Sequence, residues 1–206
     1  MIKRTSIYLI GLIITALGVA LIIRSPFGTG PWDTVGVGMS QHFGWTIGTW
    51  TIITQGVLIF ITAVIEQARP RMEAALVVVV RSWFLDIWFY FVLVHVSFPS
   101  SLLGQGIVFI VGMTCVGVGI GIYIEAKFPN SPIDELMVAI SVRFKLRLNP
   151  ARRLLELTGM FIGFIIGGPV GVGTVIIALV LGNIIQLSNR WMKQVLSRFT
   201  MATDVQ

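Results

Sequence analysis

Four ionisable residues of this sequence, Asp33, Arg81, Asp86 and Asp134, lie within or beside long apolar stretches. On insertion scales a charge at the centre of a bilayer costs about 2.5–3.5 kcal/mol, so such residues usually face the interior of a helix bundle and pair with a partner. Charges placed in this way either form structural ion pairs or line the path of an ion or a solute. For Arg81 and Asp86 the sequence favours neither role over the other.

Two of these acids belong to a repeated element. Pro31-Trp32-Asp33 and Pro132-Ile133-Asp134 stand 101 positions apart. The second copy predicts a helix with Ser131 as its N-cap, proline at the first position and the acid closing a capping box. In the first copy Gly30 takes the place of the serine. One interpretation is that both acids cap helices and favour the positive end of the dipole. The other is that the helices dip into the membrane and their ends, including Pro31, Trp32 and Pro132, face a substrate pathway.

Arg81 and Asp86 are five positions apart, about 140° around a helix, so each is expected to reach a different helix. The acids considered as partners of Arg81 are Asp33, Asp134 and Glu156. The bases considered as partners of Asp86 are Arg24 and Arg152. Glu156 also follows Arg152 at the i, i+4 spacing of a local helical ion pair.

The composition indicates an integral membrane protein. Of 206 residues, 55% are hydrophobic and 12% are charged, and the mean hydropathy is +0.90. Soluble domains carry about 25% charged residues. The net charge of +6 is explained by basic loops rather than by nucleic-acid binding. The single Cys115 excludes an internal disulfide, and we find no nucleophile–base pair, phosphate loop or zinc motif. The sequence therefore predicts no enzyme, no cofactor and no metal site.

Six stretches are predicted to span the membrane, at about residues 5–23, 46–65, 74–96, 103–124, 152–167 and 175–187. Residues 34–43 and 135–148 are predicted to form short helices that do not cross, and 188–206 a polar, basic surface tail. Basic residues before the first span, in two loops and in the tail all fall on one side. The positive-inside rule then places both termini in the cytoplasm.

The two broken elements belong to a longer duplication. At the offset of 101, Gly11 matches Gly112 and Gly18 matches Gly119. The first repeat covers residues 1–101, the second 102–190, and the tail 191–206, all within one membrane domain. Three spans in each half make the second copy inverted, an arrangement common in secondary transporters. The glycines expected to permit close backbone approach or a positive φ are Gly28, Gly30, Gly171 and Gly173.

A family resemblance follows from motifs in both halves. In the first half they are Gly28 and Gly30 before Pro31-Trp32-Asp33, and then Thr46-Ile47-Gly48-Thr49. In the second half they are Asp134 with Leu136-Met137, then Ala151-Arg152-Arg153-x2-Glu156, then Gly168-x-Val170-Gly171-Val172-Gly173-Thr174. These residues resemble the YczE-like bacterial membrane proteins, related to the YitT/YyaS grouping. The resemblance implies a bacterial inner-membrane protein whose biochemical activity is poorly defined.

We therefore expect an all-α bundle of two inverted three-span repeats, each with a short non-spanning helix after its first span. The preferred function is a small secondary transporter with alternating access. Its partners would be the lipid bilayer and an unknown small-molecule or lipid-like substrate, and an arginine inside the bundle favours an anionic or amphipathic one. The alternative is a membrane accessory protein that scaffolds or modulates a partner without transport. The sequence leaves open whether the protein forms a homodimer.

Overall fold

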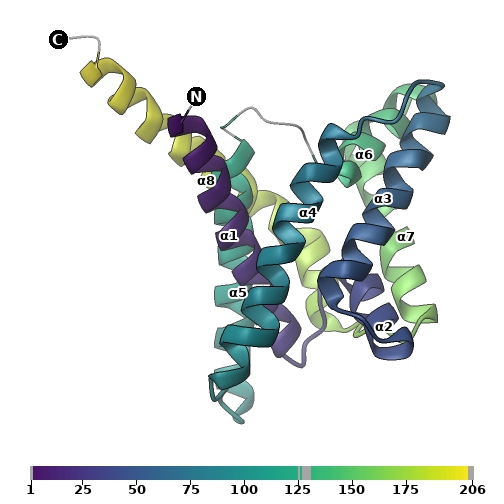
Figure 1. Ribbon diagram of the computed structural model, residues 1–206, viewed down its shortest axis with the longest axis vertical. Helices are drawn as coiled ribbons and strands as arrows, with labels where there is room; N and C mark the ends of the chain where they lie inside the picture. Colours follow the sequence, from purple (N-terminus) through teal and green to yellow (C-terminus); the bar gives the residue numbers. More distant parts are fainter. Residues whose placement is uncertain (1, 125, 127–130, 204–206) are drawn as a thin grey trace.

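The computed structural model describes residues 2–124, 126 and 131–203, and these residues form helices without any strand (Figure 1). The α-helices are α1 Ile2–Arg24, α2 Asp33–Phe43, α3 Ile47–Glu66, α4 Glu73–Asp86, α5 Leu102–Ile124, α6 Pro132–Arg143, α7 Leu148–Ile165 and α8 Val172–Thr203. A π-helix, Ile87–Val92, and a 3₁₀ turn, Leu93–His95, continue α4. The all-helical class expected from the sequence is confirmed.

Five helical segments are long and apolar enough to cross a membrane, namely residues 4–24, 47–66, 73–95, 102–124 and 172–192. The remaining predicted span corresponds to α7, which has 18 residues and carries Arg152, Arg153 and Glu156 in its first half. At 1.5 Å per residue it measures about 27 Å, slightly less than a bilayer core. The sixth span therefore stays a prediction. With 11 and 12 residues, α2 and α6 are too short to cross.

Two predicted boundaries differ in the structure. The last apolar segment, predicted to end near residue 187, extends to 192, and its helix α8 continues to Thr203 because no glycine or proline after Gly182 interrupts it. The short helix predicted for 135–148 ends at Arg143, since Lys145 takes a left-handed φ of 54° and the next helix begins at Leu148. The third span, predicted at 74–96, corresponds to the apolar segment 73–95, in which a π-helix continues α4 from Ile87.

The most extensive helix contact is between α1 and α5, which pack along each other (Figure 1). Glycines bring their backbones together. A Cβ added to Gly11 would lie 2.8 Å from the carbonyl oxygen of Gly119, and one added to Gly18 would lie 2.6 Å from that of Gly112. On the flanks, α4 packs on α1 and α8 packs on α5. Only residues without a side chain permit this approach.

The remaining helices form a second group, in which α3 packs on α6 and α2 packs on α7. Leu58 of α3 shares a buried cluster with Leu136 and Ile140 of α6 and Leu155 of α7. The face where α1 begins and α8 ends is called the terminal face, and it also carries α6 (Figure 1). There Arg71 contacts Glu66 at 2.9 Å and Glu135 at 3.9 Å. The opposite face carries α2.

Candidate functional site

The segment between α1 and α2 meets the glycine-rich turn between α7 and α8, backbone against backbone. The N–H of Thr29 donates to the carbonyl oxygen of Pro169 at 3.1 Å, and the N–H of Gly173 donates to that of Phe27 at 2.7 Å. Gly28 has a φ of 100°, and a Cβ there would lie 2.6 Å from the backbone nitrogen of Gly171. Three of the predicted glycine breaks therefore form one junction that requires glycine.

This junction fixes the start of α2 and the position of Asp33. The carbonyl oxygen of Gly30 accepts a hydrogen bond from the N–H of Thr34 at 2.9 Å, so the first helical turn begins where the sequence predicts it. Trp32 makes no side-chain capping bond. A Cβ on Gly30 would lie 2.6 Å from Oδ2 of Asp33. The carboxylate therefore folds back over the glycine, which leaves room for it.

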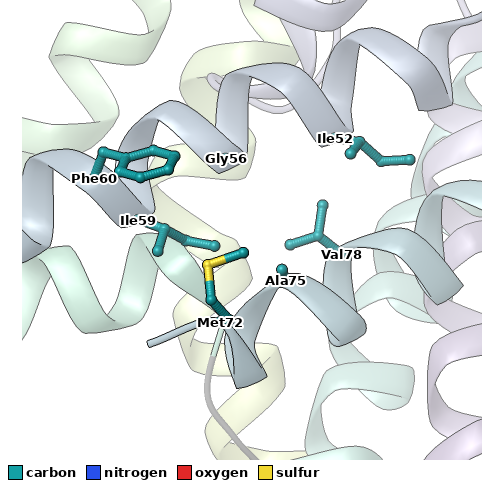
Figure 2. A pocket seen from close by; sticks show the side chains of 7 residues that line it. All are labelled: Ile52, Gly56, Ile59, Phe60, Met72, Ala75 and Val78. Carbon is teal, nitrogen blue, oxygen red and sulfur yellow. The ribbon is translucent and has the colours of Figure 1, made fainter. Parts of the chain in front are cut away.

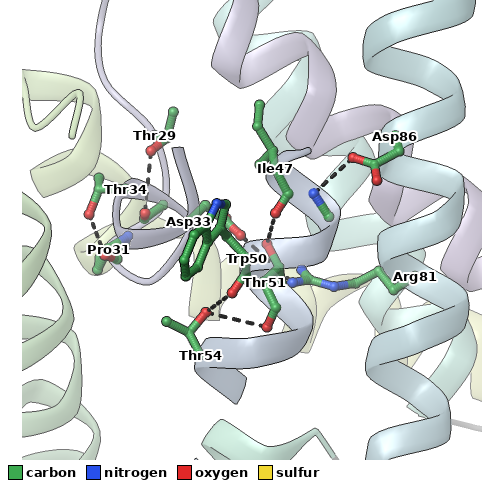
Figure 3. Close-up of polar contacts among 12 residues, drawn as sticks. Thr29, Pro31, Asp33, Thr34, Ile47, Trp50, Thr51, Thr54, Arg81 and Asp86 are labelled. Carbon is green, nitrogen blue, oxygen red and sulfur yellow. Dashed lines mark hydrogen bonds and ion pairs between the residues drawn. The ribbon is translucent and has the colours of Figure 1, made fainter. Parts of the chain in front are cut away.

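Asp33 faces Arg81 of α4, across from the junction (Figure 3). Arg81 Nη2 lies 3.7 Å from Asp33 Oδ1, and the two side chains are 18% and 19% exposed. Of the three acids considered for Arg81, Asp33 is thus the observed partner. Burial raises the pKa of the Asp33 carboxyl, and the Arg81 guanidinium offsets part of that rise. Two elements far apart in sequence therefore place opposite charges together inside the bundle.

Asp86 has a different role from the one predicted. Its Oδ1 accepts a hydrogen bond from the N–H of Gly48 at 2.8 Å (Figure 3). The hydroxyl of Tyr90 accepts one from the N–H of Ile47 at 3.2 Å. The first N–H groups of a helix have no partner within the helix, and water cannot satisfy them inside a bilayer. Asp86 therefore caps α3, and its expected pairing with an arginine is wrong.

The two arginines considered for Asp86 have other partners. Arg24 Nη2 donates to the carbonyl oxygen of Phe89 at 2.8 Å, and its guanidinium lies 4.3 Å from the centre of the Phe89 ring. Arg152 contacts the second broken element instead. Sequence reasoning missed Tyr90, although it follows Asp86 by four residues and therefore stands about one turn further along the same helical segment, in the π-helix that continues α4.

The second broken element forms a closed hydrogen-bonded group. Ser131 caps α6 by accepting from the N–H of Asp134 at 3.4 Å, and its hydroxyl donates to Asp134 Oδ2 at 2.8 Å. Arg152 donates to Asp134 Oδ1 at 2.8 Å and to Glu156 Oε1 at 2.7 Å. The predicted capping serine, the proline at the first position and the Arg152–Glu156 pair are all confirmed. Asp134 thus combines capping with an ion pair to α7.

A groove between α3 and α4 lies apart from these charges (Figure 2). Its volume is about 180 Å³, and its lining includes Ile52, Ile59, Met72 and Val78. A Cβ on Gly56, which also lines the groove, would touch no other atom. Because the lining offers no polar side chain, a polar solute would find no partner there. The ionisable residues around Asp33 and Arg81 therefore remain the candidate site.

Comparison with known proteins assigns the chain to a family. Residues 2–190 match the family of unknown function DUF6198. The chain belongs to this family. The match covers all eight α-helices up to residue 190 and therefore includes both broken elements and every residue of the candidate site.

Similar proteins with curated descriptions share most of the chain. The uncharacterized membrane protein YczE of Bacillus subtilis is 35% identical over 189 residues, which cover 91% of this chain and 86% of the relative. The uncharacterized protein YyaS of the same organism is 31% identical over 169 residues, covering 82% and 84%. An uncharacterized protein of Haemophilus influenzae is 30% identical over 184 residues, covering 89% and 82%. No solved structure matches. The resemblance to YczE-like membrane proteins is confirmed.

Proposed function

We propose that this protein is a small secondary transporter of the bacterial inner membrane, in which two inverted repeats alternate access to a central site. The terminal face, which carries most of the basic residues, would be cytoplasmic by the positive-inside rule. The solute would pass between the two groups of helices near Asp33 and Arg81. Architecture and buried charge, rather than the chemistry of a bound substrate, support this function.

The observation that carries the proposal is the reciprocal contact between α1 and α5. Gly11 approaches Gly119, and Gly18 approaches Gly112. At the offset of 101 residues, Gly112 is the counterpart of Gly11 and Gly119 is the counterpart of Gly18. Exchanging the two repeats therefore turns the first contact into the second. A contact in which i meets j and j meets i is the signature of a two-fold axis. This pairing supports two repeats related by rotation about an axis between α1 and α5.

The other helix contacts follow the same exchange. The contact of α4 with α1 corresponds to that of α8 with α5, and the contact of α3 with α6 corresponds to that of α7 with α2. One pair breaks the correspondence. α3 packs along α4, whereas its counterparts α7 and α8 meet at few positions. Alternating access requires such a difference. In one state the two repeats adopt two different arrangements, and in the other state each repeat adopts the arrangement that its counterpart had.

The direction of this difference supports an inward-facing arrangement. On the opposite face, Asp86 and Tyr90 hold the start of α3. Their counterparts on α8 are Leu187 and Trp191, which are 70% and 66% exposed. The start of α7 has no side-chain cap. At the opposite face, hydrogen bonds thus join the start of α3 to the helical segment that begins as α4. At the terminal face, the corresponding helices α7 and α8 meet at few positions.

Spin-label distance measurements can test this proposal. In a variant with Cys115 replaced by serine, labels at Asn149 and Leu187 would report the start of α7 relative to the middle of α8. We expect two populations of label-to-label distance in lipid. One of them should be short, because α7 and α8 would come together in the second state of the transporter. Labels at Ile10 on α1 and Leu103 on α5 serve as the control and should give one unchanged distance. A single long distance for the first pair, together with no solute movement in a proteoliposome screen, would favour the accessory-protein alternative.

A further inference from the structure

Arg81 has unused hydrogen-bonding capacity inside the bundle. A guanidinium presents five N–H donors, yet its one described contact is the 3.7 Å approach to Asp33, which is longer than a hydrogen bond. The other interior arginines differ. Arg24 donates to a backbone carbonyl at 2.8 Å, and Arg152 makes two hydrogen bonds at 2.7 and 2.8 Å. Arg24 also keeps one buried donor, its Nε, without an acceptor. Among the described interior arginines, Arg81 is the one whose guanidinium forms no hydrogen bond to the protein.

A second open donor belongs to the same element as Asp33. The indole Nε1 of Trp32 is buried and lacks an acceptor. Its ring packs over α7, where a Cβ on Gly159 would lie 2.9 Å from Cδ2. Unsatisfied buried donors are uncommon and call for an explanation. An ionised carboxylate carries acceptors only, and the oxygens of a phosphate are strong acceptors, so the open donors around Asp33 match the chemistry of an oxyanion.

The charges facing Asp33 determine how such an anion could bind. α4 supplies Arg81, and α7 supplies Glu156, whose carboxylate interacts repulsively with that of Asp33. α3 carries a charge only at its far end, in Glu66, and the turn at 166–171 carries none. His42 lies at the other end of α2. Because Arg152 already pairs with Glu156 at 2.7 Å, an anion at Arg81 would share one guanidinium with the carboxylate of Asp33, and two negative charges this close disfavour each other's ionised form.

We propose that Arg81 binds a small oxyanion, a carboxylate or a phosphate, and that Asp33 takes one proton from solution when the anion replaces its carboxylate at the guanidinium. The positive charge of Arg81 then stays balanced by one negative charge throughout. This inference rests on the proposed transport function, which supplies the route by which the anion enters. If the anion and the proton are both released on the other side, the protein moves them together. By linkage, the apparent affinity should fall about tenfold for each pH unit above the pKa of Asp33.

Calorimetry on the full chain in lipid nanodiscs tests the binding step separately from transport. The probes are lactate, benzoate and inorganic phosphate, each titrated at mildly acidic and at neutral pH. Each titration is repeated in two buffers of different ionisation enthalpy, so that proton uptake is counted. We expect at least one probe to bind with uptake of about one proton and to bind more tightly at the acidic pH. The carboxylates and phosphate distinguish the two sources of oxyanion.

Three variants complete the test. Asp33→Asn should bind the same probe with equal affinity at both pH values and without proton uptake. Arg81→Gln should weaken binding by more than about tenfold, as expected for loss of a charged hydrogen-bond donor. Arg71→Gln, which alters an exposed arginine on the terminal face, is the matched control and should change nothing. Helical circular dichroism and size-exclusion chromatography verify that each variant is folded.

The outcomes separate this inference from the proposed function. Binding that follows Arg81 and Asp33 without any flux in proteoliposomes would support the oxyanion site and overturn transport. Flux that persists unchanged in Arg81→Gln would support transport and overturn the oxyanion site. The inference also fails if none of the three probes binds, or if binding occurs without proton uptake and is equal in Asp33→Asn and the wild type.

Discussion

The carboxylate of Asp86 on α4 accepts a hydrogen bond from the backbone N–H of Gly48 on α3 at 2.8 Å. This contact ties two neighbouring spans together at the opposite face. Ser82 of α4 also lies close to Gly48, because a Cβ added to Gly48 would lie 2.5 Å from the carbonyl oxygen of Ser82. An acid in the middle of an apolar helix is thus explained by the needs of the neighbouring backbone.

Replacing Asp86 should therefore destabilise the protein. We expect Asp86→Ala to cost about 1–3 kcal/mol, because a buried N–H loses its acceptor. Asp86→Asn keeps an acceptor oxygen and should cost less. Thermal unfolding in detergent, followed by circular dichroism, measures the difference. Equal losses in the two variants would show that the negative charge, rather than the capping bond, is what matters.

The α1–α5 contact should not tolerate a methyl group. In Gly18→Ala the new Cβ would stand 2.6 Å from two backbone atoms, Gly112 O and Val116 N. We expect a loss of about 1–3 kcal/mol, typical of overpacking. Gly56→Ala is the matched control, because the space around Gly56 is open. It should be neutral or stabilising by up to about 1 kcal/mol, since alanine favours helix. A similar loss in both variants would contradict the predicted close packing.

Gly28 should be more sensitive to substitution than Gly44. Both have positive φ, 100° and 71°, but only Gly28 lies against other atoms. Gly44→Ala should cost about 1–2 kcal/mol from backbone strain alone. Gly28→Ala adds the clash with Gly171 and should lower the unfolding temperature further. If the two variants unfold alike, the junction between Phe27 and Gly173 yields easily and contributes little to stability.

The pH dependence of stability should contain a contribution from Asp33. Because burial raises the pKa of its carboxyl in the folded state, the folded protein holds this proton more tightly than the unfolded chain does. The free energy of unfolding should therefore rise as the pH falls through the folded-state pKa, and level off below the unfolded-state pKa. Asp33→Asn should remove this part of the slope. Unfolding curves of both proteins across the acidic range measure it, and parallel curves would contradict the prediction.

Features set by a few neighbouring residues were predictable from the sequence. Ser131 and Pro132 start α6 because capping depends on local chemistry, and Arg152 meets Glu156 because helical spacing brings them together. The partner of Asp86 was not predictable in this way. Its hydrogen bond is to a main-chain N–H, which every residue except proline carries, so no residue type in the sequence marks the donor.

Long-range placement was predictable only where the sequence limits the choices. A buried arginine needs an acid, and few acids exist, so Asp33 could be named among three candidates for Arg81. Arg24 instead found a carbonyl and an aromatic ring on Phe89, partners that are too common to single out. The loss of apolar character near Ser188 predicts a polar tail but does not reveal that the tail is helical, because polar and basic residues are as compatible with a helix as apolar ones.

The two faces of the molecule are held by forces that respond differently to salt. At the opposite face, main-chain hydrogen bonds join Phe27 to Gly173 and Thr29 to Pro169. At the terminal face, Arg71 joins Glu66 and Glu135 through charges and is 54% exposed. Dissolved ions screen exposed charges over a Debye length of about 8 Å at physiological ionic strength and leave buried amide bonds unaffected. Ionic strength should therefore act more strongly on the terminal face than on the opposite face, which gives the molecule an electrostatic difference between its two faces.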